Sequence, residues 1–557
     1  MSVWPEWKIK DFSQGMVDEV DDNLLPDNAS QDCQNFICKI LGVLRTRNGQ
    51  EHLNSSALDA GIHGLYAYYK SSSRYLVAVA GTNVYKWDTT ATPPAFSSIK
   101  SGVNATAQMY FETCANFMVG MNGVDAAFKW DGTTVTALAN APVGYFPTLF
   151  KEKLFCVPAS NTSQIWWSES FYPETWPATY YWSVKSGDGD SITGLIPYLG
   201  ELVVLKRRSI HSFRGNSIDD FSLTEQDSRI GCVSHQAAVV AGTKIYFVSD
   251  EGLYAYNGMK ATPIHSERIP KLWDNINKEY IHKACVTYWG DMVWFSLPLQ
   301  NQLNLQITTA CTLAGNVTVT LGGVSKTVVL ALTDDTADKV ATKIRALTLD
   351  GWTVSGSADT VTFVRNELKP PLTLEYSAGA TGASGTVTEV DQTTNNLVLV
   401  YDPEGGQFWP MSGIDATCFQ IYNGGSDIKL YAGSSDGYVN QQDVGTEDYG
   451  NAINAYYVTK AFDQQSAERL KKAKKLFVED LPNQENEVTV QISRDYGEYE
   501  SLDYKAGDGL IREYRFPSSS TKWRYITFKI SHNASGECEV RGVMAPIKMK
   551  NKPKVRG

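Results

Sequence analysis

A short strand–turn–strand phrase recurs along this chain and limits its fold more than any other feature. It reads GLYAYNGMKATPIH from Gly252 to His265, and earlier versions read AAFKWDGTTVTAL and GTNVYKWDTTATPPAF. In the first two, Asn-Gly and Asp-Gly supply the positive φ angles that a tight β-hairpin requires. The alternation of side chains around these turns places one face of each strand against a neighbour. The phrase therefore predicts a repeated antiparallel β unit.

Seven such units follow one another along the chain. Each spans roughly 35–45 residues, which is the length of a four-stranded propeller blade. One unit cannot bury its apolar face alone, so neighbouring units must stack, with aromatic residues in the wedge between them. This pattern favours a β-propeller, and a series of β-sandwiches is the competing interpretation. The units begin near Gly61, Ala107, Phe146, Ser191, His235, His282 and Ala416.

A segment of different composition interrupts the sixth unit from about Asn301 to Gln392. It is rich in Thr, Val, Ala and Gly, and GNVTVTLGGVSKTVVLAL predicts a hairpin that turns at Gly322-Gly323. The stretch DDTADKVATKIRAL predicts a helix with Asp335 as its N-cap. We expect a small α+β domain inserted through a blade loop, where an insertion costs little. The apolar face of its helix would be Val340, Ile344 and Leu347.

After Asp443 the chain turns to alternating strands of another style, which predict a C-terminal β-sandwich. It then ends in KMKNKPKVRG, with a positive charge at every second position. In an extended chain this spacing puts the charges on one side, so the tail is a candidate partner-binding arm. A disordered tail that only aids solubility is the alternative. The candidate residues are Lys548, Lys550, Lys552, Lys554 and Arg556.

The expected chain is therefore mainly β: a β-propeller with an inserted small α+β domain and a C-terminal β-sandwich. Its expected parts, in chain order, are an N-terminal extended segment joining the propeller (1–60), the first part of the propeller (61–300), the inserted domain (301–393), the second part of the propeller (394–445), the sandwich (446–547) and the basic tail (548–557).

Charge and cysteine usage narrow the function classes. The net charge of −11 argues against a protein that grips nucleic acid by general phosphate attraction, although DNA could still pass through without sticking. The nine cysteines are scattered, and even Cys33 and Cys38 lack further ligands at zinc spacing. We expect the cysteines to be reduced thiols in the core, as in a protein made in a cytoplasm. No apolar run approaches membrane-spanning length, and the first residues show no hydrophobic signal core.

Several motifs resemble catalytic or metal sites only in part. The acidic turn SGDGDS contains Asp188 and Asp190, but Leu199 stands where a calcium loop needs its bidentate acid. The turns at Ser249 and Ser434 lack the Trp and the spacing of sialidase motifs. We interpret all three as structural turns. No catalytic, cofactor or metal site is predicted, and an enzyme is not expected.

Histidines and a basic run have ordinary structural interpretations. His63, His211 and His235 lie in or beside strands and are expected to be packed or surface residues, because no histidine has metal-ligand spacing. The run RLKKAKKL from Arg469 to Leu476 could bind nucleic acid. The simpler interpretation is a solvated strand edge, whose charge blocks aggregation.

Several stretches together resemble a known family. They are LPDNASQDCQNFICKILGVLRTRNGQE, GLYAYYKSSSRYLVAVAGTNVYKWD, FMVGMNGVDAAFKWDG and RLKKAKKLFVEDL with VTVQISRDYGEYESL. In order and style they look like the tail nozzle, or tail hub, proteins of short-tailed phages, which are also called packaged-DNA stabilisation proteins. The resemblance covers the propeller and the C-terminal sandwich. The insert from Asn301 resembles small modules often embedded in phage tail proteins and is not required by the nozzle pattern.

The resemblance implies a homo-hexameric ring in the virion tail, assembled in the host cytoplasm. Its expected partners are a portal-adaptor ring above, a tail fibre or a needle/plug protein, and DNA that passes through without sequence-specific binding. The chain would retain packaged DNA and conduct it during ejection, without a cofactor. The alternatives are a tail-spike or fibre-attachment component that binds the host, and a propeller glycosidase or lectin.

Overall fold

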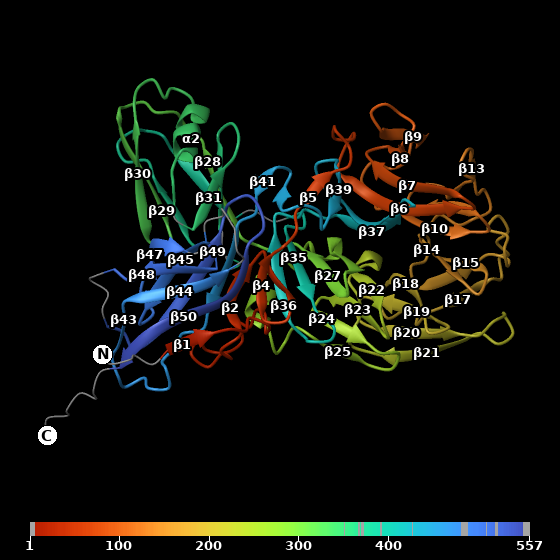
Figure 1. Ribbon diagram of the computed structural model, residues 1–557. Helices are drawn as coiled ribbons and strands as arrows, with labels where there is room; N and C mark the ends of the chain where they lie inside the picture. The colour runs from red at the N-terminus through yellow and green to blue at the C-terminus, as the bar shows by residue number, and fades with distance from the viewer. Residues whose placement is uncertain are drawn as a thin grey trace. The chain divides into compact units, whose positions relative to one another are not determined.

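Seven four-stranded antiparallel blades form a β-propeller (Figure 1). The computed structural model describes residues 6–349, 351–365, 368, 372–389, 393–425, 427–480, 488–507, 510–517 and 522–549. The mainly β fold class expected from the repeats is confirmed. The propeller and the C-terminal sandwich belong to one compact unit, and the second unit consists of Lys271–Tyr280 and Pro298–Thr393.

The first four blades are continuous in sequence, and each is a simple meander. Blade 1 contains β6 (Ile62–Lys70), β7 (Ser73–Ala80), β8 (Asn83–Asp88) and β9 (Ala95–Ser101). Blade 2 contains β10 (Tyr110–Cys114), β11 (Phe117–Met121), β12 (Phe128–Trp130) and β13 (Val135–Ala137). Blade 3 contains β14 (Gly144–Phe150), β15 (Lys153–Pro158), β16 (Gln164–Trp167) and β17 (Tyr181–Ser183). Blade 4 contains β18 (Ile192–Tyr198), β19 (Glu201–Lys206), β20 (Ile210–Arg214) and β21 (Ser222–Asp227).

The last three blades include an interrupted blade and the ring closure. Blade 5 begins after the 3₁₀ turn η1 (His235–Ala237) and contains β22 (Ala238–Ala241), β23 (Lys244–Ser249), β24 (Gly252–Tyr256) and β25 (Ala261–Pro263). The helix α1 (Pro270–Asp274) and the 3₁₀ turn η2 (Ile281–Lys283) precede blade 6, which contains β26 (Cys285–Trp289), β27 (Met292–Leu297), β35 (Leu397–Tyr401) and β36 (Phe408–Ser412). Blade 7 contains β37 (Cys418–Asn423), β38 (Ile428–Gly433), β39 (Val439–Gln442) and β5 (Gln50–His52), and is extended by β40 (Glu447–Asp448) and β41 (Asn451–Ala452).

An N-terminal strand closes the ring. β5 pairs antiparallel with β39, so that Gln50 faces Gln442 and His52 faces Asn440, and Figure 1 shows the two strands side by side. Around the ring, the innermost strands of neighbouring blades contact one another, and β37 contacts β6. Aromatic residues fill the wedges as the sequence predicted; between blades 3 and 4, for example, Phe155 and Trp167 pack against Phe213.

The insert leaves and re-enters blade 6 at adjacent positions. β27 pairs with β35 over its length, and Leu297 and Leu397 are direct partners. Between them lie two sheets, formed by β28 (Gln302–Ile307), β31 (Trp352–Ser355), β32 (Thr360–Arg365) and β34 (Gly385–Glu389) in one, and by β29 (Gly315–Leu321), β30 (Val324–Leu330) and β33 (Leu374–Ser377) in the other.

One helix, α2 (Ala337–Arg345), packs on the core of the insert through Val340 and Ile344. The helix begins one residue later than the sequence predicted. Thr336, not Asp335, is the N-cap, because the Thr336 side chain accepts the Lys339 N–H. The predicted hairpin turn is confirmed, since Gly322 and Gly323 connect β29 to β30 with φ values of 55° and 85°.

The C-terminal sandwich uses both ends of the chain. One sheet contains β1 (Glu6–Ile9), β3 (Phe36–Ile40), β4 (Val43–Thr46), β43 (Lys471–Ala473), β44 (Lys475–Asp480), β47 (Asp503–Gly507), β48 (Ile511–Arg515) and β50 (Glu539–Met549). The other contains β2 (Ser30–Gln34), β42 (Ala455–Thr459), β45 (Val488–Arg494), β46 (Glu500–Ser501) and β49 (Ile526–His532).

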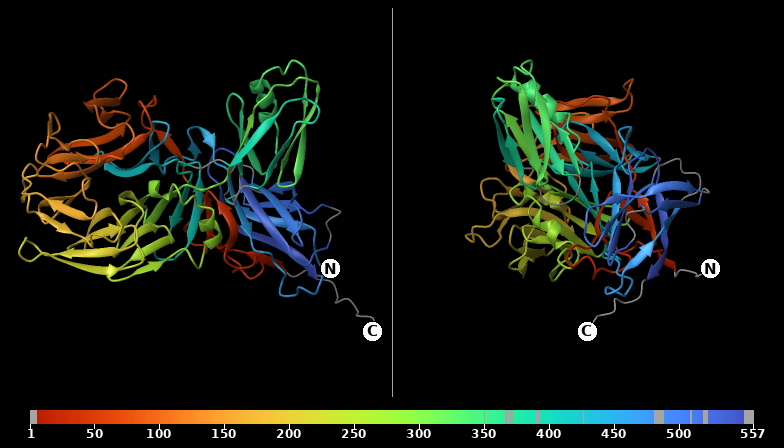
Figure 2. Two further views of the ribbon diagram at one scale, coloured as in Figure 1. Left: turned by 180° about the vertical axis from the view of Figure 1, so that it is seen from behind. Right: turned by 90° about the vertical axis from the view of Figure 1, so that its left-hand side faces the viewer.

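The N-terminal region is therefore more than a segment joining the propeller. β1 and β4 pair with β50, and β2 pairs with β42, so residues near both ends share one domain (Figure 2). Without these strands, β50 and β42 would each expose unpaired backbone groups along one edge, which is unfavourable and prone to aggregation.

Candidate functional site

A cavity of about 250 Å³ lies on the propeller axis. Its walls come from residues in or next to the innermost strands β6, β10, β26 and β37, together with η1 and the start of β22. The lining mixes aromatic, aliphatic and neutral polar side chains, and no Asp, Glu, Lys or Arg is among them. The lining residues are Leu65, Tyr66, Met109, Tyr110, Phe111, His235, Gln236, Ala238, Cys285, Val286, Cys418, Phe419 and Gln420.

His235 is held firmly at one wall of this cavity. Its ring stacks on Phe146 at 5.1 Å between centroids and meets the edge of Tyr110 at 5.5 Å. The backbone N–H of Leu195 donates to His235 Nδ1 at 3.4 Å, and Gly194 permits this approach, since a Cβ there would lie 3.2 Å from the His235 Cα. Burial lowers the pKa of His235 to about 4, so the imidazole is neutral near pH 7.

A half-buried carboxyl group, that of Glu112, lies on β10 beside the cavity lining. Glu112 accepts the backbone N–H of Thr113 at 2.8 Å and that of Leu149 at 3.3 Å. Burial raises the pKa of Glu112 above its ordinary value. The Tyr66 hydroxyl bonds to the Thr113 hydroxyl at 2.8 Å, which ties β6 to β10. The cavity thus offers hydrogen-bonding groups and ring faces, and its lining does not contain the two carboxyl groups that most glycosidases use.

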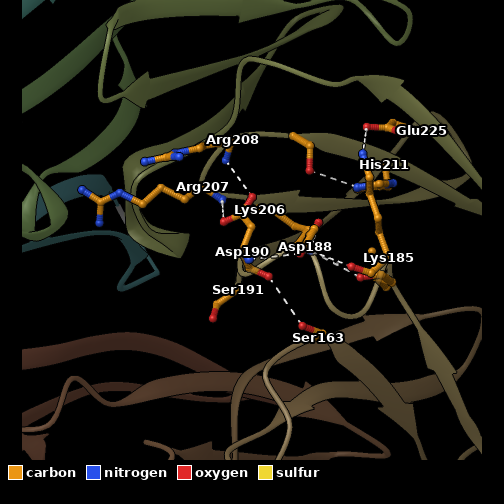
Figure 3. A network of polar contacts seen from close by, with 12 residues as sticks. Ser163, Lys185, Asp188, Asp190, Ser191, Lys206, Arg207, Arg208, His211 and Glu225 are labelled. Carbon is orange, nitrogen blue, oxygen red and sulfur yellow. Dashed lines mark hydrogen bonds and ion pairs between the residues drawn. The ribbon is translucent and has the colours of Figure 1, made fainter.

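The acidic turn before blade 4 serves the fold. Asp188 holds the Lys206 ammonium with both carboxylate oxygens, at 2.8 and 2.7 Å, and the Lys206 side chain is fully buried (Figure 3). Asp190 accepts the backbone N–H groups of Arg207 and Arg208. Burial opposes ionisation of Asp188, but its hydrogen bonds with Lys206 and the Asp190 N–H lower its pKa overall.

A lysine thus occupies the position where a cation would sit in the calcium interpretation. Among the residues that the structure describes, no group of three His, Cys, Asp or Glu side chains is placed to hold a metal ion. The two sialidase-like turns are also hairpins. β23 ends at Ser249, and the Ser434 hydroxyl accepts the Tyr438 N–H in the turn between β38 and β39.

His63, His211 and most of the cysteines are packed. His63 and His211 are 9% and 2% exposed, and burial lowers the pKa of each. All nine cysteines are free thiols, and all except Cys38 are buried. Burial raises the pKa of Cys114 to about 11 and that of Cys232 to about 12, so these thiols are protonated and unreactive.

The basic run has largely structural contacts. Lys471 is fully buried in β43 and donates to the carbonyls of Ser466 and Arg524. Lys475 pairs with Glu513 on the neighbouring strand β48 at 2.8 Å. At least Lys471 is therefore not available as a nucleic-acid contact.

Only one of the five predicted arm residues lies within the described part of the chain. Lys548 is in β50, opposite Lys472 of β43, and is exposed. The strand runs to Met549, because pairing with β43 continues to that residue, so Lys548 belongs to the sandwich and not to a tail. Lys550, Lys552, Lys554 and Arg556 lie outside the described residues.

The sequence did not point to the axial cavity. His235 was expected to be a packed or surface residue; its ring is packed on Phe146 and Tyr110, and it also lines the cavity. The order of strands in the repeats held a signal for this site, since the first strand of each propeller blade lies nearest the axis, and polar residues near its start are candidates for an axial site. Tyr110 of β10 and Gln420 of β37 meet this criterion, whereas His235 lies in η1, just before β22.

The comparisons with known proteins bear on the fold alone. No protein-family model and no curated protein matches the chain. Among solved structures, the designed protein Ika8 covers 71% of this chain with 99% of its own (11% identity, TM-score 0.34). The Neurospora crassa Pan2 WD40 domain covers 72% with 95% of its own (7% identity, TM-score 0.33). An exo-β-1,3-galactanase from Phanerochaete chrysosporium covers 90% with 100% of its own (9% identity, TM-score 0.26).

Such scores carry no functional argument, and the propeller assignment rests on the seven blades themselves. No helix among the described residues is both long and apolar enough to cross a membrane.

Proposed function

We propose that this protein is a structural subunit of a phage tail, a nozzle or hub ring that retains packaged DNA and conducts it during ejection. Two lines of evidence support the proposal. One is the sequence resemblance, and the other is the mainly β structure, in which a propeller is followed by a C-terminal sandwich. The subunit would form a homo-hexameric ring in the virion tail, below a portal-adaptor ring and next to a fibre or needle protein. It would act without catalysis.

The observation that carries this proposal is the bonded joint between the propeller and the sandwich. Asn35 lies between β2 and β3 of the sandwich in a left-handed conformation, with φ 58°. Its N–H donates to Pro410 O in blade 6, its side-chain oxygen accepts the Ser412 N–H, and its amide donates to Asn454 O just before β42. A subunit that must resist the pressure of packaged DNA benefits from hydrogen bonds that join its two parts.

The axial cavity also bears on where DNA would pass. A cavity of about 250 Å³ is too small to hold a DNA duplex, so we do not place the conduit in this cavity. A DNA channel would therefore have to form between subunits, which requires a ring. The net charge of −11 suits such a channel, because few phosphate contacts would have to break during ejection.

Electron microscopy of the purified full-length protein, alone and with a candidate portal-adaptor complex, tests the proposal. We expect closed rings, with six subunits, that cap the adaptor end-on. A protein that stays monomeric at all concentrations and does not associate with the adaptor would contradict it. A glycan-hydrolysis screen tests the alternative of a propeller glycosidase.

A further inference from the structure

We propose that the axial cavity binds one neutral sugar residue, as a site independent of the ring-forming role. The site is built by residues from five blades, and its position does not depend on neighbouring subunits.

The charge of the lining selects the ligand class. None of the thirteen lining residues is an Asp, Glu, Lys or Arg. An anionic ligand would have to leave water without a counter-charge, which is strongly unfavourable. The acid beside the lining, Glu112, has its pKa raised by burial, which favours its neutral form and weakens any attraction for a cation. A neutral ligand therefore fits this lining best.

The polar groups of the lining provide both donors and acceptors. Since His235 Nδ1 accepts the Leu195 N–H, the ring proton is on Nε2, which is a donor. The Gln420 amide donates to Ile421 O at 2.9 Å, which leaves its oxygen as an acceptor. The Tyr110 hydroxyl is a further polar group of the lining, and it can both donate and accept. A sugar hydroxyl both donates and accepts, so a sugar can satisfy this mixed set.

The apolar part of the lining fits the apolar surface of a sugar ring, as the polar groups fit its hydroxyls. Tyr66, Phe111 and Phe419 contribute aromatic rings, and the centroids of Tyr66 and Phe111 are 5.7 Å apart. Aromatic surfaces with a few fixed polar groups are typical of small-molecule sites. The cavity volume of about 250 Å³ lies just below the roughly 300–1,000 Å³ of typical ligand pockets, which suits a ligand as small as one sugar residue.

Titration of the full-length protein with neutral monosaccharides tests the proposal, with saturation-transfer NMR and calorimetry as readouts. The panel contains glucose, galactose, mannose and N-acetylglucosamine, with glucuronate as the charged member. We expect at least one neutral sugar to bind with a Kd of about 1 mM, and glucuronate to bind at least about tenfold more weakly. Methyl glycosides and disaccharides distinguish a free monosaccharide from the terminal residue of a glycan.

A double variant, Gln236→Ala with Gln420→Ala, should weaken binding at least about tenfold, because it removes two of the polar groups. The matched control is Gln441→Ala, which removes the same amide from β39 of blade 7, where Gln441 accepts Lys429 Nζ at 3.1 Å. The control should bind like the wild type.

The proposal is overturned if no neutral sugar binds at about 10 mM, in which case the cavity holds only water. It is also overturned if binding survives the double variant, or if glucuronate binds as tightly as the neutral sugars. Unchanged thermal unfolding of both variants would show that a loss of binding is not a loss of fold.

Discussion

The guanidinium of Arg47 faces the carboxylate of Asp448 in a two-pronged ion pair, with 2.9 Å between Nη1 and Oδ1. Its remaining N–H groups donate to the Asn35 side chain and to the carbonyls of Asn48 and Ser412, so all five donors are used. The Arg47 side chain is 2% exposed. This cluster ties the end of β4 to blade 6 and to the extension of blade 7.

Replacing Arg47 should loosen the joint between propeller and sandwich. In Arg47→Met, Asp448 loses its counter-charge and several carbonyls lose a donor. Removal of one partner of a buried ion pair costs about 3–5 kcal/mol. We expect a loss of free energy of unfolding in this range, measured by urea denaturation.

Arg515→Met is the matched control, because Arg515 is 57% exposed and lies 3.7 Å from Glu513. It should change stability little. Equal effects of the two substitutions would show that the Arg47 cluster is not a structural joint.

Lys206 and Asp188 form a second buried ion pair, between blades 3 and 4. Lys206→Met should lower the free energy of unfolding by about 3 kcal/mol, the lower end of the range for such pairs, because Asp188 keeps 22% exposure. Adding Asp188→Asn should recover part of the loss. Lys185→Met, at a pair that is 47% and 34% exposed, should have little effect.

The same pair gives the protein a defined acid dependence. Folding lowers the pKa of Asp188 below its ordinary value of about 3.9. The pair therefore contributes its full stability above that value, and the contribution is lost as the pH falls through the lower folded-state pKa. In the Lys206→Met and Asp188→Asn double variant, the decline of stability below about pH 4 should be shallower than in the wild type. Identical acid profiles would contradict this assignment.

The insert should be dispensable for the propeller. Leu297 and Leu397 are paired neighbours in blade 6, so a short Gly-Ser linker can replace residues 301–392 without stretching the hairpin. We expect a soluble protein with a β-sheet circular dichroism spectrum and cooperative unfolding. Aggregation, or loss of the β signal, would mean that the insert is part of the propeller core.

The basic end of the chain should contribute to assembly. Truncation after Met549 removes Lys550, Lys552, Lys554 and Arg556 but leaves β50 intact. If these residues dock on an acidic partner surface, the association of wild-type subunits into a ring should weaken as the salt concentration rises. The truncated subunits should associate more weakly at low salt, and their association should no longer depend on salt. Analytical ultracentrifugation across a salt series measures both effects, and identical curves would remove the arm from the proposal.

A truncation after Pro546 is the structural comparison for that experiment. It also removes Ile547, which is 2% exposed and paired with Ala473, so it should destabilise the sandwich itself.

Duplex DNA should bind the isolated protein weakly at physiological salt. The net charge of −11 provides little phosphate attraction, and a conduit works best with few tight contacts. A fluorescence anisotropy titration at about 0.2 M salt measures the affinity. Nanomolar binding that persists at that salt concentration would contradict the nozzle proposal.

Local sequence patterns determined the repeating part of this protein. Alternating side chains and Asn-Gly or Asp-Gly turns specify hairpins by short-range sterics, so the blade units, the interruption of the sixth unit and the turn at Gly322-Gly323 could be predicted. The calcium-like turn could also be judged from spacing alone, because Leu199 occupies a ligand position.

Only the tertiary structure decided how distant segments pair. Strands pair through backbone hydrogen bonds, which depend little on which side chains are present. The pairing of β5 with blade 7, and of β1, β2 and β4 with strands of the sandwich, could therefore not be predicted from the sequence. The same holds for Arg47 and Asp448, which meet across 401 positions, and for His235. His235 reaches the cavity because Gly194 leaves it room and Phe146 supports its ring, a geometry that arises only when the blades close around the axis.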